Sequence, residues 1–205
     1  MDPVSFFVEK YFHPVYKKRV AQYIADLCFS GAHILDLGCD DGYVACLIKE
    51  LKPSVRIYGV DVQERTPALI DRAMYDGKTI PYPDGYFDIV ICVDCLHHTE
   101  NIAPMLLEMK RVARRYVIIK DHTANSFWEK CLLRFSDYST NFCYKIKCTY
   151  NFPSMMGWEN LFKYAGLRIV KQPRGLQFGF GITDRFNPIF KLSSDPNLFE
   201  EGVQQ

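Results

Sequence analysis

Apolar positions along the chain follow two different spacings in turn. Near-continuous apolar runs, typical of strands covered on both faces, alternate with segments in which apolar residues recur every three or four positions, as on one side of a helix. The apolar runs predict strands at 33–38, 55–62, 87–94, 115–121 and 167–172. The helical spacing predicts helices at 43–51, 103–113, 126–135 and 154–166. This alternation predicts an α/β fold whose sheet is mostly parallel and doubly wound, with helices on both faces.

Three further stretches complete the predicted architecture. Residues 4–28 have helical spacing, which Pro14 divides into two helices. The stretch before Asp76 has room for a short helix and then a brief strand, but not for a full crossover helix. Near the C-terminus, glycines predict a hairpin that returns antiparallel through 185–192, so that the sheet has seven strands. We expect a helical cap at 1–29, a main domain at 30–192 with an insert at about 122–165, and a flexible tail at 193–205.

Composition limits the classes of function. The chain has 205 residues, of which 48% are hydrophobic, so a packed core is expected. With 25 basic and 24 acidic residues the net charge is +1, whereas nucleic-acid binders usually have a basic excess, so we expect no nucleic-acid partner. No apolar run approaches the ~20 residues that span a bilayer, and the N-terminal segment lacks the features of a secretory signal. We therefore expect a cytoplasmic protein without a membrane partner.

The chain has eight cysteines, but their spacing argues against a metal site. Cys92 and Cys95 form a C-x-x-C on an apolar strand. A zinc ribbon needs a second pair with similar spacing, and Cys143 with Cys148 fits that requirement poorly. We predict reduced thiols and no metal.

The first predicted strand ends in a glycine turn that contains two acids. Gly38 and Gly42 allow the backbone to turn tightly and to approach a ligand. A dinucleotide loop would offer helix N–H groups to a pyrophosphate, but Asp40 and Asp41 would repel phosphate there. The same carboxylates can instead cap the following helix. The loop thus favours a ligand with a positive end and no phosphate groups.

Four segments resemble successive motifs of class I S-adenosylmethionine-dependent methyltransferases. They are ILDLGCDDGYVA (34–45), YGVDV (58–62), DGKTIPYPDGYFDIVICVDCLHH (76–98) and EMKRVARRYVIIKD (108–121). The nearest group is the small-molecule type, and the chain departs from its pattern by having Asp40 in place of the middle glycine. The resemblance covers about residues 30–121. It implies a Rossmann-like fold and S-adenosyl-L-methionine as the cofactor.

The resemblance also implies roles for residues at the first two strand ends. Asp36 and Gly38 match the motif that lies against the methionine end of the cofactor. Asp61 matches the acid that binds the ribose, and its position after the second strand independently suggests that it accepts both ribose hydroxyls. An ordinary turn acid is the alternative for Asp61.

Two later strand ends match the family as well. Asp76 and Gly77 match the pair at the adenine edge, while Asp94 and Cys95 match the strand end near the methionine amino group and sulfur. A cofactor with a sulfonium and an ammonium suits a crevice lined by aspartates, including Asp94. The predicted cofactor-binding residues are Asp36, Gly38, Cys39, Asp40, Gly42, Asp61, Val62, Asp76, Gly77, Asp94 and Cys95.

Candidates for catalysis follow the fourth and fifth predicted strands. Methyl transfer is an in-line displacement at a carbon that the sulfonium already activates, so alignment of the nucleophile supplies most of the catalysis. A base is needed only when the nucleophile arrives protonated. His97 and His98 follow the fourth strand, and Asp121 and His122 follow the fifth. Packing and helix capping are the alternative roles of these four side chains.

The insert is dense in aromatic residues from Phe127 to Trp158. They form either ordinary core or a lid that closes the substrate pocket and excludes water. Aromatic walls would suit an apolar or cationic acceptor.

The predicted function is methyl transfer from S-adenosyl-L-methionine to a small-molecule acceptor. One alternative is a tRNA or protein methyltransferase, which the near-neutral charge and the lack of an added binding domain oppose. Another is a nucleotide-dependent dehydrogenase, which the acids of the glycine loop oppose. A non-catalytic relative that binds the cofactor or a partner is the third, and Asp40 leaves it open. The oligomeric state is not predicted.

Overall fold

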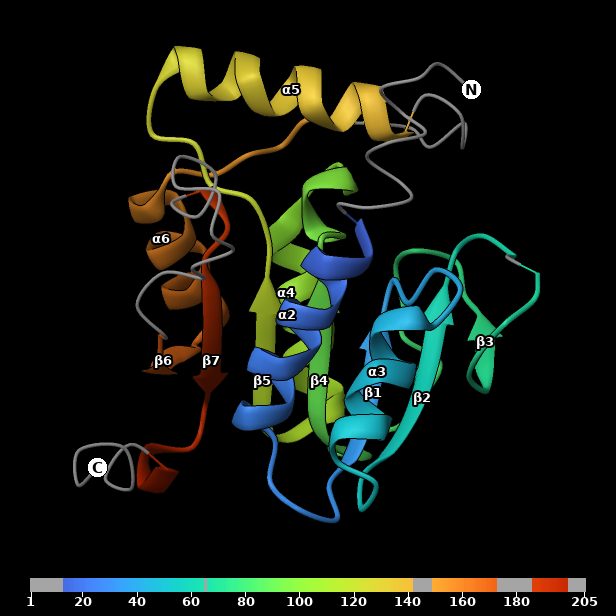
Figure 1. Cartoon of the computed structure of the whole chain (residues 1–205). Helices are drawn as coiled ribbons and strands as arrows, with labels where there is room; N and C mark the ends of the chain where they lie inside the picture. The colour runs from blue at the N-terminus through green and yellow to red at the C-terminus, as the bar shows by residue number, and fades with distance from the viewer. Residues whose placement is uncertain (1–12, 65, 142–148, 173–185, 199–205) are drawn as a thin grey trace.

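The computed structural model describes residues 13–64, 66–141, 149–172 and 186–198. Its centre is a seven-stranded sheet with the order β3-β2-β1-β4-β5-β7-β6 (Figure 1). The strands are β1 (His33–Leu37), β2 (Arg56–Asp61), β3 (Arg72–Met74), β4 (Phe87–Val93), β5 (Ala113–Lys120), β6 (Arg168–Lys171) and β7 (Ile189–Ser193). The helices are α2 (His13–Leu27), α3 (Tyr43–Leu51), α4 (Ile102–Val112), α5 (Phe127–Asn141), α6 (Met155–Ala165) and the short 3-10 helix η2 (Leu96–His98).

The first five strands run parallel, and β7 runs antiparallel to both β5 and β6. In the register of the sheet, Ile34 of β1 lies opposite Ile57 of β2 and Ile89 of β4. The carboxyl ends of the parallel strands therefore meet at one edge, where ligands of such sheets bind. The predicted fold, a Rossmann-like mostly parallel sheet of seven strands with antiparallel C-terminal strands, is confirmed.

Each face of the sheet is buried under helices, which explains the near-continuous apolar runs in the sequence. On one face, Ile34 packs in a core with Ile24 of α2 and Ile48 of α3. On the other face, the next residue of β1, Leu35, packs in a second core with Met109 of α4. Helix α6 packs in the second core, on the face of the sheet opposite α2 and α3 (Figure 1).

Most predicted elements match the observed ones to within one or two residues, and the exceptions have local causes. Pro14 lies in the first turn of α2, where its missing N–H needs no partner. The predicted helix before Pro14 lies outside the described residues. Helix α5 continues to Asn141, past its predicted end at 135. Among the described residues between β2 and Asp76 there is the three-residue strand β3 but no helix, so the predicted short helix is not found there.

The C-terminal part follows the prediction only in outline. Gly175, Gly179 and Gly181, which suggested the hairpin turn, lie outside the described residues. The returning strand begins at Ile189, not at 185. Within the stretch predicted as a tail, Ser193 belongs to β7, and Leu198 is buried in a sheet core.

The insert divides into two parts with different surroundings. Helix α6 belongs to the body of the protein, because Trp158 and Phe162 are fully buried against the sheet. Helix α5 lies across the carboxyl ends of the strands and exposes Phe127 and Trp128 (Figure 1). The aromatic residues of the insert thus include both core and surface side chains. No helix in the described ranges is long and apolar enough to cross a membrane.

Candidate functional site

The loop after β1 touches the end of β4. Gly38 has a φ of 71°, and a Cβ at this position would overlap the Sγ of Cys95. Glycine is required here because it alone combines that backbone angle with the close approach. The N–H of Gly38 also donates to the carbonyl of Val60 at 2.8 Å. The ends of β1, β2 and β4 are thereby held together.

Asp40 adopts the left-handed conformation that a glycine would favour at this position of the motif. Its φ is 52°, a value that aspartate tolerates better than most residues do. The N–H of Asp40 donates to Oδ2 of Asp61 at 2.8 Å, and its carbonyl accepts from Arg72 at 2.5 Å. The turn is therefore preserved despite the substitution.

Helix α3 begins directly after this loop. Gly42 has a φ of 83°, and a Cβ there would lie 2.5 Å from Cγ1 of Ile70, so this position also requires glycine. The predicted capping of the helix by an acid is observed at Asp41, whose Oδ1 accepts from the N–H of Tyr43 at 3.0 Å.

Asp61 lies at the carboxyl end of β2, where the sequence placed it, and is half-buried. Its Oδ2 accepts from the N–H of Asp40, and its Oδ1 accepts from the N–H of Gln63 at 2.9 Å. A carboxylate oxygen has more than one acceptor site, so both oxygens can still accept a hydroxyl. The geometry suits a ribose with two neighbouring hydroxyl groups.

Asp36 and Cys39 lie deeper, beside the same loop. Burial, reinforced by the charge of Asp61, raises the pKa of Asp36 to about 7. A cation bound nearby would favour the ionised carboxylate. Burial, reinforced by Asp36 and Asp61, raises the pKa of Cys39 to about 12, so its thiol is not a nucleophile at neutral pH.

The end of β3 lies beside the end of β2. Asp76 is exposed, and its Oδ1 accepts from the N–H groups of Thr79 and Lys78, both at 2.8 Å, which lowers its pKa. Gly77 has a φ of 75°, and a Cβ there would lie 3.1 Å from Cγ1 of Val62. Val62 is itself exposed, so an apolar side chain lies next to an ordered acidic turn.

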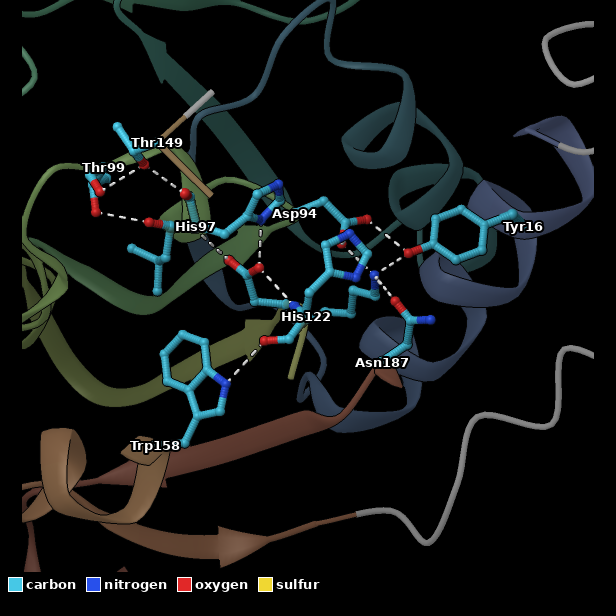
Figure 2. Close-up of polar contacts among 11 residues, drawn as sticks. Tyr16, Asp94, His97, Thr99, His122, Thr149, Trp158 and Asn187 are labelled. Atoms are coloured by element: carbon cyan, nitrogen blue, oxygen red, sulfur yellow. Dashed lines mark hydrogen bonds and ion pairs between the residues drawn. The ribbon is translucent and has the colours of Figure 1, made fainter. Parts of the chain in front are cut away.

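Asp94 belongs to a polar cluster that the sequence did not reveal. Its carboxylate forms an ion pair with the fully buried Lys120 and accepts from the hydroxyl of Tyr16 at 2.8 Å. Lys120 also donates to Tyr16 and to Oδ1 of Asn187, the latter at 2.8 Å. Figure 2 shows Tyr16, Asp94 and Asn187 directed toward one point from three different parts of the chain.

This cluster corrects the expectation that Asp94 adds negative charge to a cofactor crevice. Burial acts to raise the pKa of Asp94, but the charge of Lys120, its hydrogen bond to the carboxylate and the contribution of His122 together outweigh burial and lower that pKa. The carboxylate is therefore ionised, and its charge is compensated by Lys120. Asp94 has a φ of 50°, so the ion pair also holds a strained turn at the end of β4.

His97 and Asp121 form a second pair across the ends of β4 and β5. His97 Nδ1 lies 2.6 Å from Oδ1 of Asp121, and the N–H of His97 donates to Oδ2 at 3.3 Å. Thr149 adds a hydrogen bond to the His97 carbonyl at 2.7 Å (Figure 2). Both side chains are buried, so an acceptor molecule does not reach them in this conformation. Among the catalytic candidates, His97 and Asp121 can therefore orient neighbouring side chains but do not contact an acceptor in this conformation.

His98 and His122 are the more accessible candidates. His98 is half-buried, with its ring centroid 4.0 Å from that of His97. His122 Nε2 lies 3.7 Å from Oδ1 of Asp94, and burial, reinforced by Lys120, lowers the pKa of His122 to about 4. The imidazole is therefore neutral at pH 7. Its Nδ1 is buried and has no hydrogen-bond partner in the part of the chain that the structure describes.

Sequence reasoning missed Lys120 and Asn187, and it placed Tyr16 in the N-terminal helical cap without linking it to Asp94. Lys120 left one signal, because a lysine interrupts the apolar strand at 115–121 and a buried lysine requires partners. Tyr16 and Asn187 left none, since each lies far along the chain from Asp94 and their meeting depends on the packing of α2 and β7.

The strand ends fit S-adenosyl-L-methionine, the cofactor implied by the sequence. Two observations support this fit. The loop of Gly38 leaves no room for a side chain, and the oxygens of the half-buried Asp61 can each accept a further hydrogen bond. Asp36 adds a carboxyl group whose ionisation a cation would favour. Among the described residues, no group of three or more His, Cys, Asp or Glu side chains has the geometry of a metal site.

Comparison with known proteins agrees with this geometry. Residues 8–172 match the model of a family described as a methyltransferase domain. A probable S-adenosylmethionine-dependent methyltransferase of Mycolicibacterium smegmatis is 33% identical over 103 residues, which cover 46% of this chain and 38% of that protein. Ajmaline N-methyltransferase of Rauvolfia serpentina is 27% identical over 94 residues, covering 40% of this chain and 32% of that protein. The matched segments thus span only 38% and 32% of the lengths of these relatives.

A solved structure is similar over most of the chain. It is a putative methyltransferase in complex with the Haloferax volcanii Trm112 methyltransferase activator. The TM-score is 0.64 at 14% identity, with 95% of this chain and 98% of that chain covered, and it supports the fold. Because the family model matches most of the chain, the chain belongs to the methyltransferase domain family, as a class I member that uses S-adenosyl-L-methionine.

Proposed function

We propose that the protein transfers a methyl group from S-adenosyl-L-methionine to a small-molecule acceptor held at the ends of β4 and β5. The observation that carries the proposal is the contact between Gly38 and Cys95. Cys95 is followed by η2 (Leu96–His98), which carries His97 and His98, so the glycine loop lies close to these candidate proton acceptors. A methyl donor on the loop would face polar side chains across a short distance.

The proposed cofactor contacts divide by the parts of the molecule that they recognise. Asp61 accepts the ribose hydroxyls, and the turn of Asp76 and Gly77 lies at the adenine edge beside Val62. Asp36 stabilises the positive methionine end, and Gly38 allows close backbone approach. When bound, the cofactor supplies a methyl carbon that its sulfonium has already activated.

We assign the proton-accepting role to Nδ1 of His122, which is buried in this conformation, so the role requires the ring or the segment packed over it to move when the acceptor binds. The imidazole is neutral at pH 7, and its Nε2 faces Asp94, which favours the tautomer with the proton on Nε2 and the lone pair on Nδ1. A protonated nucleophile would give its proton to that nitrogen as it attacks the methyl carbon. The ring of Phe152, 5.9 Å from His122, helps to exclude water. The N–H of His122 donates to Asp121 at 2.6 Å, so the His97–Asp121 pair holds His122 in place.

A small acceptor is supported by two features. The net charge of +1 offers little attraction to a nucleic acid. Ajmaline N-methyltransferase, a relative over part of the chain, is named for a small-molecule substrate. The competing candidate is a macromolecular acceptor with an activator partner, which the similarity to a Trm112-bound methyltransferase favours.

Labelled methyl transfer into a cell extract separates these possibilities. The purified protein is incubated with extract and S-adenosyl-L-methionine carrying a labelled methyl group, and the products are separated by size. Label in the small-molecule fraction supports the proposal, whereas label only in protein or RNA overturns it. Cofactor binding without any labelled product would favour the non-catalytic relative.

The role of His122 is tested in the same assay with a soluble acceptor that this screen identifies. Replacement of His122 by Gln removes the basic nitrogen, and we expect transfer to fall about a hundredfold or more while cofactor affinity is retained. His33→Gln, on a half-buried histidine at the start of β1, is the matched control and should leave transfer unchanged. Equal rates of methyl transfer for the wild type and His122→Gln would show that His122 is not the base.

A further inference from the structure

Helix α5 carries apolar side chains on the side that faces away from the protein. Phe127, Trp128, Leu132 and Phe135 are exposed to 70%, 78%, 49% and 72%. With 3.6 residues per turn these positions fall on one side of the helix, with the half-buried Cys131 between them. We call these five residues the α5 stripe.

The opposite side of α5 attaches the helix to the protein. Leu133 is buried in a small core with Ala124, Phe152 and Phe186, separate from the two cores of the sheet. Because Leu133 points inward, the stripe, which lies across the helix from it, points outward. The helix also lies across the carboxyl ends of the strands, where the candidate site is located (Figure 1).

Positive charge lies along one border of the stripe. Up to residue 135, the charged side chains of α5 are Glu129, Lys130 and Arg134. Glu129 caps the helix start, since its Oε2 accepts from the N–H groups of Asn125 and Ser126 at 2.6 Å and 3.1 Å. Lys130 and Arg134 are exposed, and the helical spacing places them between Leu133 and the stripe.

The composition of this surface identifies the kind of partner. Aromatic and leucine side chains on one side of a helix, with lysine and arginine beside them, are typical of a helix that lies in the surface of an anionic bilayer. Tryptophan prefers the boundary between lipid and water. Five side chains are far fewer than the roughly 20–30 residues that each partner contributes to a stable protein interface. A second copy of the chain is therefore a poorer fit than a lipid surface.

We propose that the α5 stripe docks the protein on an anionic membrane surface, and that the methyl acceptor is an amphiphile drawn from that surface. The membrane docking is inferred from the stripe alone, whereas the amphiphilic acceptor rests on the proposed function. The docking revises the expectation of no membrane partner, which rested on the lack of a spanning segment. A helix lying in the interface needs no such segment.

The two tryptophans of the chain provide a direct measurement of docking. Trp128 is in the stripe, and Trp158 is fully buried, so only Trp128 can enter a lipid phase without unfolding. We expect its emission to shift to the blue on addition of vesicles of phosphatidylcholine and phosphatidylglycerol, and less with phosphatidylcholine alone. The shift should be absent in Trp128→Phe. A shift of equal size in Trp128→Phe, or none in the wild type, would overturn the docking.

Vesicle sedimentation with a matched control tests the stripe as a whole. Exchange of Trp128 and Phe135 for Ser should lower partition onto the mixed vesicles by about tenfold or more. Tyr164→Ser removes a comparably exposed aromatic side chain from α6 and should leave partition unchanged. Equal losses in both variants would contradict a role for the stripe. A self-association in ultracentrifugation that the Ser exchanges abolish would assign the stripe to a second copy instead.

Two further readouts separate this proposal from the proposed function. Calorimetry should show that the stripe variant binds S-adenosyl-L-methionine as the wild type does, because the stripe lies outside the cofactor contacts. In the labelling assay, methyl transfer should appear in the lipid fraction of vesicles made from extracted membranes and fall in the stripe variant. Vesicle docking without cofactor binding would overturn the function but not the surface. Transfer only to water-soluble molecules would overturn the lipid acceptor.

Discussion

Two aspartates of the site, Asp40 and Asp94, hold backbone angles that most residues avoid. Asp40 is held by hydrogen bonds of its own N–H and carbonyl, and Asp94 by an ion pair and the Tyr16 hydroxyl. In each case a neighbouring loop or strand supplies the restraint, which is how strained residues persist at functional sites.

The left-handed angle of Asp40 predicts an ordering of two variants. Asp40→Gly fits that angle without strain, whereas Asp40→Ala does not, and neither keeps the carboxylate. We expect Asp40→Gly to be the more stable by about 1 kcal/mol in urea unfolding. Equal stability of the two variants would show that the turn is not left-handed at this position. If the carboxylate itself weakens cofactor binding, both variants should bind more tightly than the wild type.

Asp36 predicts a dependence of stability on pH. Its pKa of about 7 in the folded protein lies above the ordinary value of 3.8. Between these values the folded state holds a proton that the unfolded chain has released, so stability falls as the pH rises from about 4 to 7. Asp36→Asn cannot release such a proton. From about pH 5 to pH 8, the Tm of the wild type should fall relative to that of Asp36→Asn.

The exposed Asp26→Asn serves as the control for this experiment. Its Tm should follow the wild-type curve across the same pH range. A constant difference in Tm between the wild type and Asp36→Asn would contradict the raised pKa.

At the scale of the elements, the cluster around Lys120 joins α2, β4, β5 and the segment before β7. A buried lysine is stable only with partners, and the three oxygens that it contacts come from parts of the chain far apart in sequence. The cluster therefore couples the N-terminal helix to the candidate site.

This coupling predicts a large effect of Lys120→Met. The variant leaves the Asp94 carboxylate without its cation, and we expect a loss of about 3 kcal/mol in the free energy of unfolding. Adding Asp94→Asn should recover at least about 1 kcal/mol of that loss, because the uncompensated charge is then removed. Lys49→Met, on an exposed lysine of α3, should change stability by less than about 0.5 kcal/mol. Additive losses for Lys120→Met and Asp94→Asn would show that the pair is not coupled.

The elements that sequence predicted best are those that two cores cover. Residues such as Ile34 and Leu35 alternate between the cores and leave a clear apolar run. Helix α3 packs in one core, and its apolar spacing predicted its observed bounds, Tyr43 and Leu51. The edge strand β3 has no such pattern because its three residues are not buried. The outward direction of the stripe on α5 was equally invisible, since apolar spacing alone does not tell which side of a helix meets the protein.

At the scale of the whole molecule, topology decides which predicted residues meet. The strand order places the ends of β1, β2, β3 and β4 next to one another. The predicted cofactor residues therefore come together because of the topology of the sheet. Sequence located Asp61 and Asp94 equally well, but only the packing of Lys120 and Tyr16 showed that the charge of Asp94 is compensated. The positions of the site residues at the strand ends were thus predictable from the sequence, whereas their hydrogen-bond and ion-pair partners were not.

The central claim is that this edge of the sheet binds S-adenosyl-L-methionine through the Asp61 carboxylate. Calorimetric titration with S-adenosyl-L-methionine, its demethylated product and NAD tests it directly, with Asp61→Ala and the exposed Asp71→Ala as a matched pair. We predict that both sulfur compounds bind, that NAD does not, and that Asp61→Ala weakens binding by about tenfold or more while Asp71→Ala leaves it unchanged. Binding of NAD alone, or equal affinities in the two variants, would contradict the account.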